Sequence, residues 1–448
     1  MKLKWSQYIL TVNSVDGKRV ILQNTLDGHT ITIKTDIKDI LDSVISKEIR
    51  EDSIPPYIQD HLKNLTKTGI LVPKTLNERE KYIQFISKAQ INADKTFSLV
   101  LVTTTSCQFN CSYCFEQGIK RQELMDNKTA DKIIIWCQKY LDNHSKCNQW
   151  HVHLIGGEPL LNKEIIKYIL PKLSLIAKEK NIPFTIELTS NGTLLDLEIL
   201  TFLNKYNLNT VNISVDGPKE VHDIRRTDKT NQGSFERIFH NIYEGFNHNL
   251  LKKLYLSITC DKQNINSLPQ LFDYLVENKL QNKVFLVFNM IYVSTSEVLG
   301  KNITGSHYQK FDLPENQKAL KYLWLCREAK KRGLIIPKRW QIGPVCIAQS
   351  NSSAVIQPNG SLLKCPRGIG HPEYTFGNVI TTNEVYDPAF NLPVSLDTCF
   401  AKKCSLIPIC NGGCRLHGNT SNKNSSEPYC RKVFIEKVNK GLLQLNFD

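Results

Sequence analysis

Three cysteines that could bind a metal cluster stand close together in the chain. Cys107, Cys111 and Cys114 are separated by three and by two residues. The apolar run Phe97–Thr103 precedes them and is typical of a buried strand, so they follow the carboxyl end of a strand, where α/β folds place their chemistry. Three thiolates can bind three irons of a four-iron cubane and leave the fourth iron open. Zinc sites usually take four protein ligands, and this stretch offers no fourth.

Polar and glycine-rich stretches follow three further predicted strands. The first is a run of two glycines, a glutamate and a proline: Gly156, Gly157, Glu158 and Pro159. The glycines let the backbone approach a ligand closely, and a carboxylate beside them can accept an ammonium group. Asn191 and Ser214 mark the ends of the next two strands, where each segment would also suit a plain turn.

The cysteine loop, with Tyr113 before its last cysteine, resembles the signature Cx3Cx(aromatic)C of the radical S-adenosylmethionine (SAM) enzymes. The resemblance implies a 4Fe–4S cluster on Cys107, Cys111 and Cys114, whose open iron is chelated by SAM. One electron then cleaves SAM to methionine and a 5′-deoxyadenosyl radical, which abstracts a substrate hydrogen. Such chemistry belongs to the cofactor, while the protein positions it and shields it from water.

The later motifs occupy positions at which this family contacts SAM. The GGEP run is similar to the motif that grips the SAM amino group. Asn191 and Ser214 fall where the family contacts the carboxylate and the ribose. The stretch His222–Arg226 resembles HDxxR, whose arginine, here Arg226, can pair with the SAM carboxylate; the adjacent Arg225 leaves the choice between two arginines open.

Seven more cysteines fall in the last quarter of the chain: Cys346, Cys365, Cys399, Cys404, Cys410, Cys414 and Cys430. Zinc ribbons would use four of them at most, whereas two iron–sulfur clusters use more. The remaining cysteines have no partner at ligand spacing and are predicted to be buried core residues: Cys137, Cys147, Cys260 and Cys326.

The C-terminal pattern resembles the SPASM domain, the two-cluster extension of radical enzymes that mature peptides and proteins. The family's ligand order implies a first auxiliary cluster on Cys346, Cys365 and Cys414, and a second on Cys399, Cys404, Cys410 and Cys430. The family commonly has CxxC where this chain has Cys399-x4-Cys404. Because the set is one short of eight, we expect one iron of the first auxiliary cluster to lack a cysteine and to be open to water, another side chain or a substrate atom.

Alternating strands and helices are predicted around these motifs, which argues for parallel βα units. The predicted strands lie at 97–103, 150–155, 184–189, 209–214, 254–260 and 284–289, with helices such as 129–141, 163–179 and 234–248 between them. Six such units match the open, partial (β/α)6 TIM-like barrel that the resemblance implies. We therefore place an α/β radical SAM barrel at residues 93–310, a bridging helical segment at 311–339, and a cysteine-rich iron–sulfur domain at 340–448.

The N-terminal stretch, residues 1–92, is predicted to be a small α+β unit similar to a winged helix. Three strands (8–13, 18–23 and 29–34), two amphipathic helices (37–50 and 55–66) and a short apolar run (69–73) follow one another. This order resembles the peptide-recognition domain of many peptide-maturing radical enzymes, in which a leader peptide adds a strand to the sheet edge. The alternative is a stabilising cap on the catalytic domain.

The composition of the chain limits which binding partners and which cellular compartment we expect. The formal charge of +14 suits an acidic partner such as a leader peptide, a flavodoxin or a ferredoxin, or reflects a Lys-rich proteome. No long basic run or nucleic-acid motif points to nucleic acid. The sequence contains no signal peptide and no apolar stretch long enough to span a membrane. The fourteen cysteines are not spread as in a secreted scaffold, so we expect a reducing cytoplasm.

These inferences predict a radical SAM/SPASM enzyme with SAM and three 4Fe–4S clusters that modifies a ribosomally made precursor peptide. The predicted product is an intramolecular crosslink, as a thioether, a carbon–carbon bond or an ether. Alternatives are an anaerobic sulfatase-maturing enzyme, which usually lacks such an N-terminal domain, and a peptide epimerase. A non-catalytic iron–sulfur electron carrier is a further alternative, but such a protein has no use for a SAM pocket.

Overall fold

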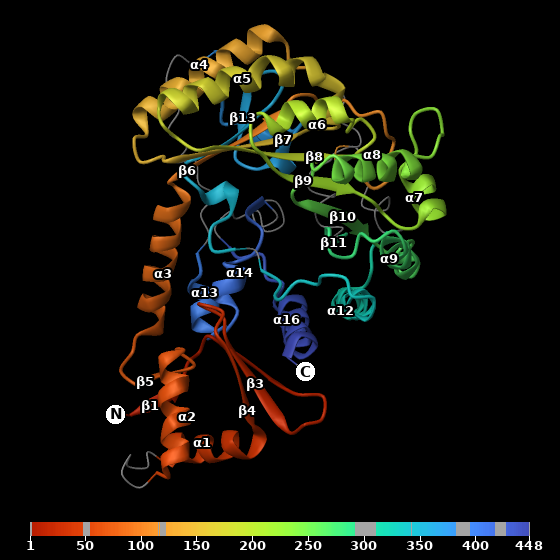
Figure 1. The fold of residues 1–448 in the computed structure, drawn as a ribbon. Helices are drawn as coiled ribbons and strands as arrows, with labels where there is room; N and C mark the ends of the chain where they lie inside the picture. The colour runs from red at the N-terminus through yellow and green to blue at the C-terminus, as the bar shows by residue number, and fades with distance from the viewer. Residues whose placement is uncertain are drawn as a thin grey trace.

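The computed structural model describes residues 2–47, 54–114, 116, 122–291, 311–341, 343–381, 395–416 and 427–447. Its central element is a nine-stranded sheet in the order β11-β10-β9-β8-β7-β6-β12-β13-β14 (Figure 1). The six strands from β6 to β11 run parallel to their neighbours. They are β6 (Thr96–Val102), β7 (Gln149–Ile155), β8 (Phe184–Ser190), β9 (Leu208–Ser214), β10 (Leu254–Cys260) and β11 (Val284–Met290). All six predicted strands are thus confirmed.

Helices cover one face of this sheet, as Figure 1 shows. They include α4 (Asn127–Asn143), α5 (Lys163–Glu179), α6 (Leu197–Asn204), α7 (Lys219–Arg225), α8 (Phe235–Asn247) and α9 (Leu268–Glu277). Side chains alternate along each strand: in β7, Trp150, Val152 and Leu154 are buried in the main core, while His151 and His153 are half-buried on the other face. The α/β fold is therefore the open, partial barrel that the sequence predicts.

The C-terminal region continues the barrel sheet instead of standing apart from it. β12 (Ser353–Ile356) pairs parallel with β6, with Ser353 opposite Ser98. β13 (Ser361–Leu363) and β14 (Gly377–Asn378) follow antiparallel. The sequence did not predict this pairing, which supplies the hydrogen-bond partners that the outer edge of β6 would otherwise lack.

After β11, four α-helices lie within the residues that the structure describes. α12 (Glu315–Lys331) lies within the predicted bridging segment and packs against α16 (Lys432–Phe447) near the C-terminus. The short helices α13 (Asp397–Ala401) and α14 (Ile407–Cys410) carry part of the cysteine-rich sequence. Within the described residues, no helix has the length and hydrophobicity needed to cross a membrane.

The N-terminal unit contains the three predicted strands and two predicted helices. The strands β2 (Ile9–Asn13), β3 (Arg19–Asn24) and β4 (Thr30–Lys34) form an antiparallel sheet in that order. The helices are α1 (Thr35–Lys47), whose predicted end at residue 50 lies outside the described residues, and α2 (Pro56–Lys67). A ribbon that the sequence did not predict joins β1 (Leu3–Trp5) to β5 (Leu71–Pro73).

One long helix was missed by the sequence analysis. α3 (Glu78–Ala93) connects the N-terminal unit to β6 and runs along one side of the molecule in Figure 1. It begins at Asn77, whose side chain accepts a hydrogen bond from the Glu80 amide. Only Glu78 and Tyr82 of this helix are fully buried, so it has no continuous apolar stripe from which its period could be recognised.

The N-terminal unit docks on the cysteine-rich region through a separate apolar cluster. Tyr8, Leu26, Tyr82 and Ile407 are buried together there. The Tyr82 hydroxyl donates a 2.8 Å hydrogen bond to Oδ1 of Asn411, which is buried as well. On its other side, the N-terminal sheet packs against α16. The unit is therefore held by two independent contacts.

Replacing Tyr82 by Phe should lower the free energy of unfolding by about 1–3 kcal/mol, because the buried Asn411 oxygen loses its hydroxyl donor. The matched control is Tyr57→Phe, since Tyr57 is 55% exposed. Urea unfolding of the two cluster-free variants measures the difference. Equal stability of both variants and the wild type would show that the docking contact contributes nothing.

Candidate active site

The cysteine loop follows the carboxyl end of β6, as predicted. Cys111 is buried, and Cys107 and Cys114 are half-buried. The loop is turned tightly: the Phe109 amide donates to Sγ of Cys107 at 3.4 Å, and the Cys114 amide to the Cys111 carbonyl at 3.1 Å. Burial raises the pKa of Cys107 to about 11 and that of Cys114 to about 12, and the neighbouring thiols add to both shifts. The three thiols are therefore close enough to act on one another.

The GGEP run packs backbone to backbone against the start of this loop. The Gly157 amide donates to the Thr104 carbonyl at 3.0 Å, and the Glu158 amide to the Ser106 carbonyl at 2.9 Å. A Cβ at Gly156 would collide with the Thr104 carbonyl oxygen, and one at Gly157 with that of Ser106. The two glycines are thus required by the approach of this loop to the cysteine loop, a reason that sequence reasoning did not give.

Glu158 ties the ends of β7 and β8 together. It is fully buried and accepts hydrogen bonds from the Leu160 amide, the Ser190 hydroxyl and the Asn191 amide, at 3.1, 2.9 and 2.7 Å. Burial raises the pKa of this carboxyl. Pro159 begins the 3-10 turn Pro159–Asn162 that follows. A contact of Glu158 with the SAM amino group stays a prediction.

The two polar turns predicted as SAM contacts lie at the same end of the sheet. Oδ1 of Asn191 accepts from the Thr193 amide and hydroxyl at 3.0 and 2.7 Å, and from Nε2 of Gln108 in the cysteine loop at 3.4 Å. Ser214 ends β9 and is half-buried opposite Ser257 of β10. Asn191 therefore touches the cysteine loop, whereas Ser214 stands one strand further along.

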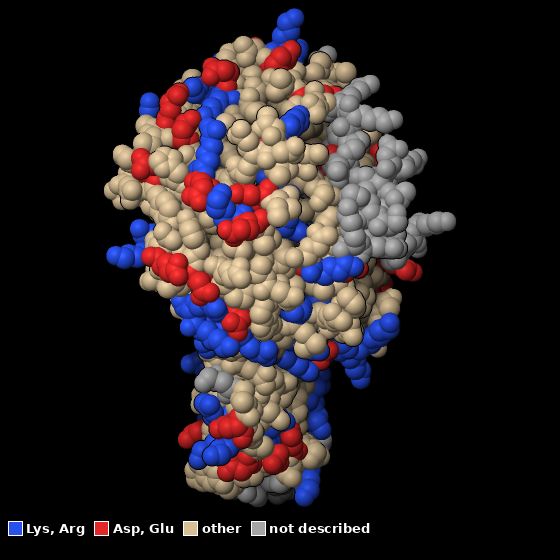
Figure 2. Space-filling view, turned by 90° about the vertical axis from the view of Figure 1, so that its right-hand side faces the viewer, with Lys and Arg blue, Asp and Glu red and all other residues tan. Residues whose placement is uncertain are grey.

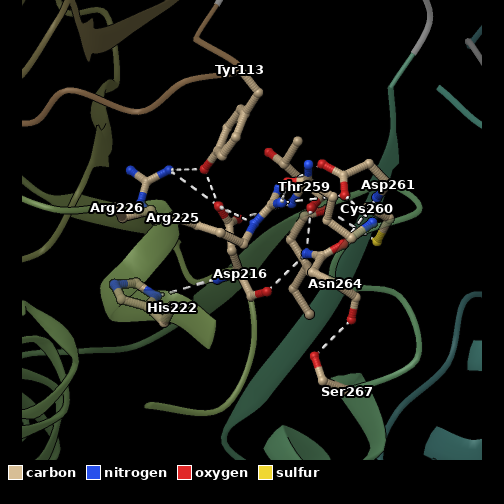
Figure 3. A network of polar contacts seen from close by, with 12 residues as sticks. Tyr113, Asp216, His222, Arg225, Arg226, Thr259, Cys260, Asp261, Asn264 and Ser267 are labelled. Carbon is tan, nitrogen blue, oxygen red and sulfur yellow. Dashed lines mark hydrogen bonds and ion pairs between the residues drawn. The ribbon is translucent and has the colours of Figure 1, made fainter. Parts of the chain in front are cut away.

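Figure 3 shows the polar network that separates the two arginines. Arg225 forms a two-pronged ion pair with Asp261, at 2.7 and 3.2 Å. Nη1 of Arg226 instead donates to the Tyr113 hydroxyl at 2.6 Å. The Tyr113 hydroxyl in turn donates to the carboxylate of the fully buried Asp216. Arg226 is therefore the arginine that hydrogen-bonds to the cysteine loop, while the Arg225 guanidinium lies over the Tyr113 ring at 4.8 Å.

Sequence reasoning did not assign roles to the two aspartates of this network. Asp216 was visible only as part of a strand-ending turn, Ser214–Pro218, and Asp261 directly follows β10. Their common signal is an acidic residue at the carboxyl end of a predicted strand, a position where polar side chains converge.

Three donors at this site are buried without an acceptor among the described residues: Nδ2 of Asn191, Nε of Arg225 and Nε of Arg226. Buried donors nearly always have a partner, so an acceptor from outside the chain is expected here. An anionic carboxylate, such as that of SAM, meets this need. With three grouped thiols alongside, the residues present fit a SAM-binding 4Fe–4S cluster.

Thiols of each predicted C-terminal group act on one another electrostatically, and their assignment to two clusters stays a prediction. Burial raises the pKa of Cys365 to about 12, and the thiols of Cys346 and Cys414 add to the shift. Burial likewise raises the pKa of Cys410 to about 12, and the same effect comes from the other three members of its group, Cys399, Cys404 and Cys430. The longer Cys399–Cys404 spacing is closed by a turn in which the Cys404 amide donates to the Cys399 carbonyl at 3.1 Å.

No group of three or more His, Cys, Asp or Glu in the described part of the chain is arranged to hold a single metal ion. The thiolates of a four-iron cluster each bind a different iron, so they stand further apart than the ligands of one ion. The four cysteines predicted to belong to the core are all buried: Cys137, Cys147, Cys260 and Cys326.

A cavity of about 400 Å³ lies on the inner face of the barrel, between β6, β7 and the segment that carries Cys346. His151, His153 and Ser98 line it together with Cys346. Behind it, Glu187 of β8 accepts a 2.6 Å hydrogen bond from Asn212 and lies 3.3 Å from His151. Polar side chains on this wall therefore lead to the first C-terminal cysteine group, beside apolar lining from Leu99, Val100 and Ile347.

Comparison with known proteins identifies the family. Residues 101–275 match the model of the Radical SAM superfamily. The Fe-coproporphyrin III synthase of Methanosarcina barkeri is 28% identical over 45% of this chain, which spans only 46% of that relative. The radical SAM cyclopropyl synthase TigE of Paramaledivibacter caminithermalis is 22% identical over 92% of this chain and 89% of its own. A cysteine-type anaerobic sulfatase-maturating enzyme of Clostridium perfringens is 24% identical over 75% of this chain and 95% of its own.

Solved structures share the fold. Native anSMEcpe with bound AdoMet and the Kp18Cys peptide superposes with a TM-score of 0.59 at 18% identity, covering 78% of this chain and 99% of its own. SuiB of Streptococcus suis gives a TM-score of 0.50 at 17% identity over 95% and 98% of the two chains.

The buried imidazole of His222 should make stability depend on pH. Its Nδ1 accepts from the Asp216 amide at 3.3 Å, its Nε2 lies 2.9 Å from the Ser234 hydroxyl, and burial lowers its pKa from 6.5 to about 4. Between these values the unfolded chain binds the extra proton first, so stability is full above about pH 6.5 and falls by about 3 kcal/mol as the pH drops towards 4.

Urea unfolding of the cluster-free protein across this pH range measures the loss, and His222→Gln should flatten the profile. A profile that is equally steep in the variant would contradict the assignment.

The family match begins in β6 and ends in α9. It therefore includes the cysteine loop, the glycine run that packs on it and the arginine that reaches Tyr113. The sequence match, the barrel and the shared fold agree, and this chain is an enzyme with a radical SAM domain at residues 101–275.

Proposed function

We propose that this enzyme modifies a ribosomally made precursor peptide, and that its N-terminal unit holds the leader segment of that peptide. The observation that carries the proposal is a cavity of about 560 Å³ beside an open sheet edge in this unit. β4 is the outer strand of the N-terminal sheet and pairs only with β3 among the described residues. An extended peptide can add a strand to such an edge and gain affinity from backbone hydrogen bonds.

The lining of the cavity supports a peptide ligand with apolar and acidic side chains. Ile31 and Ile33 of β4 and Leu65 of α2 supply apolar surface, and His61 and Lys67 supply donors and positive charge. The formal charge of the whole chain is +14. On the face seen in Figure 2, Lys and Arg gather in a band where the broad upper body narrows towards the N-terminal unit. An acidic leader would be attracted to both.

The relatives support a peptide substrate without defining the product. TigE aligns over nearly the whole of this chain, and SuiB covers 95% of it. The sulfatase-maturating structure, determined with a bound peptide, covers 78% of this chain and nearly all of its own, so about a fifth of this chain lies outside it. The additional N-terminal unit favours a leader-dependent maturase over formylglycine formation. The product class we propose is an intramolecular crosslink: a thioether, a carbon–carbon bond or an ether.

Cys107, Cys111 and Cys114 would hold a 4Fe–4S cluster that, together with SAM, would supply the radical chemistry for hydrogen abstraction from the substrate. The chain's own residues position this pair. Tyr113 is fixed by Arg226 and Asp216, which sets the last turn of the cysteine loop. The backbone bonds from Gly157 and Glu158 fix its beginning. The buried donors of Asn191 and Arg226 have no acceptor among the described residues and would hold the SAM carboxylate.

We further propose that the two C-terminal cysteine groups hold two auxiliary 4Fe–4S clusters. The first group offers three thiolates, so one iron of its cluster has no cysteine ligand. Cys346 lines the inner cavity of the barrel, which makes this group reachable from the substrate side. A reduced flavodoxin or ferredoxin is the proposed electron donor, since both are acidic partners for a basic protein.

Iron counting with cysteine variants tests the cluster assignment. The anaerobically reconstituted wild type should hold about twelve irons per chain, and loss of any one cysteine group should remove about four. Replacing Cys107, Cys111 and Cys114 together by Ala should abolish formation of 5′-deoxyadenosine. Replacing Cys346, Cys365 and Cys414 together should preserve SAM cleavage but remove the crosslinked product.

The buried Cys137→Ala serves as control and should keep all irons, because this thiol lies outside the three groups. If the variant that lacks Cys107, Cys111 and Cys114 still cleaves SAM, the proposed active site is contradicted. A wild type with only about four irons would contradict the auxiliary clusters.

Charge reversal at the N-terminal cavity tests the leader site. Lys67→Glu should weaken binding of the leader peptide at least tenfold and reduce its salt dependence, because the variant repels an acidic peptide. Lys88→Glu on the exposed face of α3 makes the same charge change outside the cavity and should bind like the wild type. Fluorescence anisotropy with a labelled leader measures both. Equal weakening by the two variants would show that only the net charge matters.

A further inference from the structure

Arg415 is a buried cation whose only hydrogen bonds within the described part of the chain go to two backbone carbonyls. It follows Cys414 directly and is 5% exposed. Its Nη2 donates to the Asn411 carbonyl at 2.5 Å and its Nη1 to the Gly413 carbonyl at 3.4 Å. Its Nε is buried without an acceptor among the described residues, and no carboxylate there forms an ion pair with it.

A buried guanidinium without an anion is strongly unfavourable, so this arrangement calls for a negative partner. Three of the four groups that act on Arg415 are thiols, and the fourth is the Tyr82 phenol. Burial lowers the pKa of Arg415, and the thiols of Cys346, Cys410 and Cys414 raise it. Cys346 and Cys414 belong to the first C-terminal group and Cys410 to the second. The two carbonyls that accept from the guanidinium belong to Asn411, next to Cys410, and to Gly413, next to Cys414, so it lies in the loop that joins the two groups.

Asn411 holds the guanidinium in this position. It follows Cys410 in the left-handed conformation, with φ 47°, so its carbonyl turns towards Arg415. Its side-chain amide donates to the Pro344 carbonyl at 2.7 Å, two residues before Cys346, and its Oδ1 accepts from Tyr82 of α3. One residue thus joins both cysteine groups and the helix that leads to the N-terminal unit.

We propose that Arg415 is the shared counter-ion of the two auxiliary clusters and that its charge keeps the reduction potentials of both above the values they would otherwise have. The inference rests on the two-cluster assignment made above. A 4Fe–4S core on three or four thiolates is an anion, and reduction adds one more negative charge. A fixed cation stabilises the reduced state more than the oxidised state, and the effect is largest where water is excluded.

In the cluster-free protein, the Arg415 charge should destabilise the fold instead of stabilising it. Without clusters, the Arg415 charge has no anion, so replacing it by an apolar residue of similar length should leave the protein at least as stable. A merely structural Arg415 would instead stabilise the cluster-free protein through its bonds to Asn411 and Gly413. The two roles therefore predict opposite changes in the stability of the cluster-free protein when Arg415 is replaced.

The test is a redox titration of the anaerobically reconstituted full chain, followed by electron paramagnetic resonance. In Arg415→Met, the equilibrium constant for one-electron reduction of both auxiliary clusters should fall at least tenfold, which corresponds to about 59 mV. Arg415→Lys, which keeps the charge, should retain most of the wild-type potential. The SAM-binding cluster is the internal reference and should not shift.

Arg79→Met is the matched control. This arginine is exposed, is paired with Asp397 at 2.6 Å and stacks on Phe400 next to Cys399. Because the charge of Arg79 is already paired and solvated, its removal should leave both potentials unchanged.

Each outcome decides the inference. A wild type that binds no auxiliary clusters overturns the assignment on which the inference rests. If both auxiliary clusters are loaded in Arg415→Met and neither potential changes, the shared counter-ion proposal is wrong. It is also wrong if only one of the two potentials changes. If Arg415→Met cannot be loaded, urea unfolding of the cluster-free proteins decides, because a variant less stable than the wild type would show a structural role only.

Discussion

The geometry of the active site depends on the contact between two backbones, at Gly156–Glu158 and at Thr104–Ser106. Two amide-to-carbonyl hydrogen bonds join these segments, and neither glycine could carry a Cβ without a collision. This contact fixes where the cysteine loop leaves β6. Glu158 extends the connection to β8, and the Tyr113 hydroxyl extends it to β9 through Asp216. The carboxyl ends of neighbouring strands are thereby tied to one loop before any cofactor binds.

Electrostatics in this protein follows from where charge is buried. Arg225 forms a two-pronged ion pair with Asp261 within the network, whereas Arg226 and Arg415 have no two-pronged carboxylate partner among the described residues. Both of the latter lie beside grouped thiols, one in the barrel and one between the C-terminal groups. Buried cations next to sulfur are stabilised when the sulfur sites carry negative charge, as they would in the loaded protein. The same side chains therefore stabilise the loaded protein and set its electrostatic potential.

Much of the fold could be predicted from the sequence because its signals are local. The six barrel strands are short apolar runs, and the cysteine, glycine and HDxxR motifs stand at their carboxyl ends. The grouping of Cys346 with Cys365 and Cys414 came from a family pattern, and the structure places these thiols together. What could not be predicted depends on contacts that are distant in sequence. Helix α3 has only two fully buried residues, β12 gains its place by pairing with β6, and Asp216 matters because Tyr113 lies against it.

The pairing of β12 with β6 has a consequence for how such enzymes diversify. The cysteine-rich region is joined to the barrel by backbone hydrogen bonds within one sheet, with Ser353 and Ile356 opposite Ser98 and Leu101. It is therefore not a module that gene fusion or truncation could add or remove at a linker, because its loss would strip the outer edge of a core strand. Recombination between such enzymes would have to exchange the barrel edge and the C-terminal region together. The N-terminal unit meets its neighbours through side chains of α3 and α16, so evolution could exchange it for another by repacking a surface.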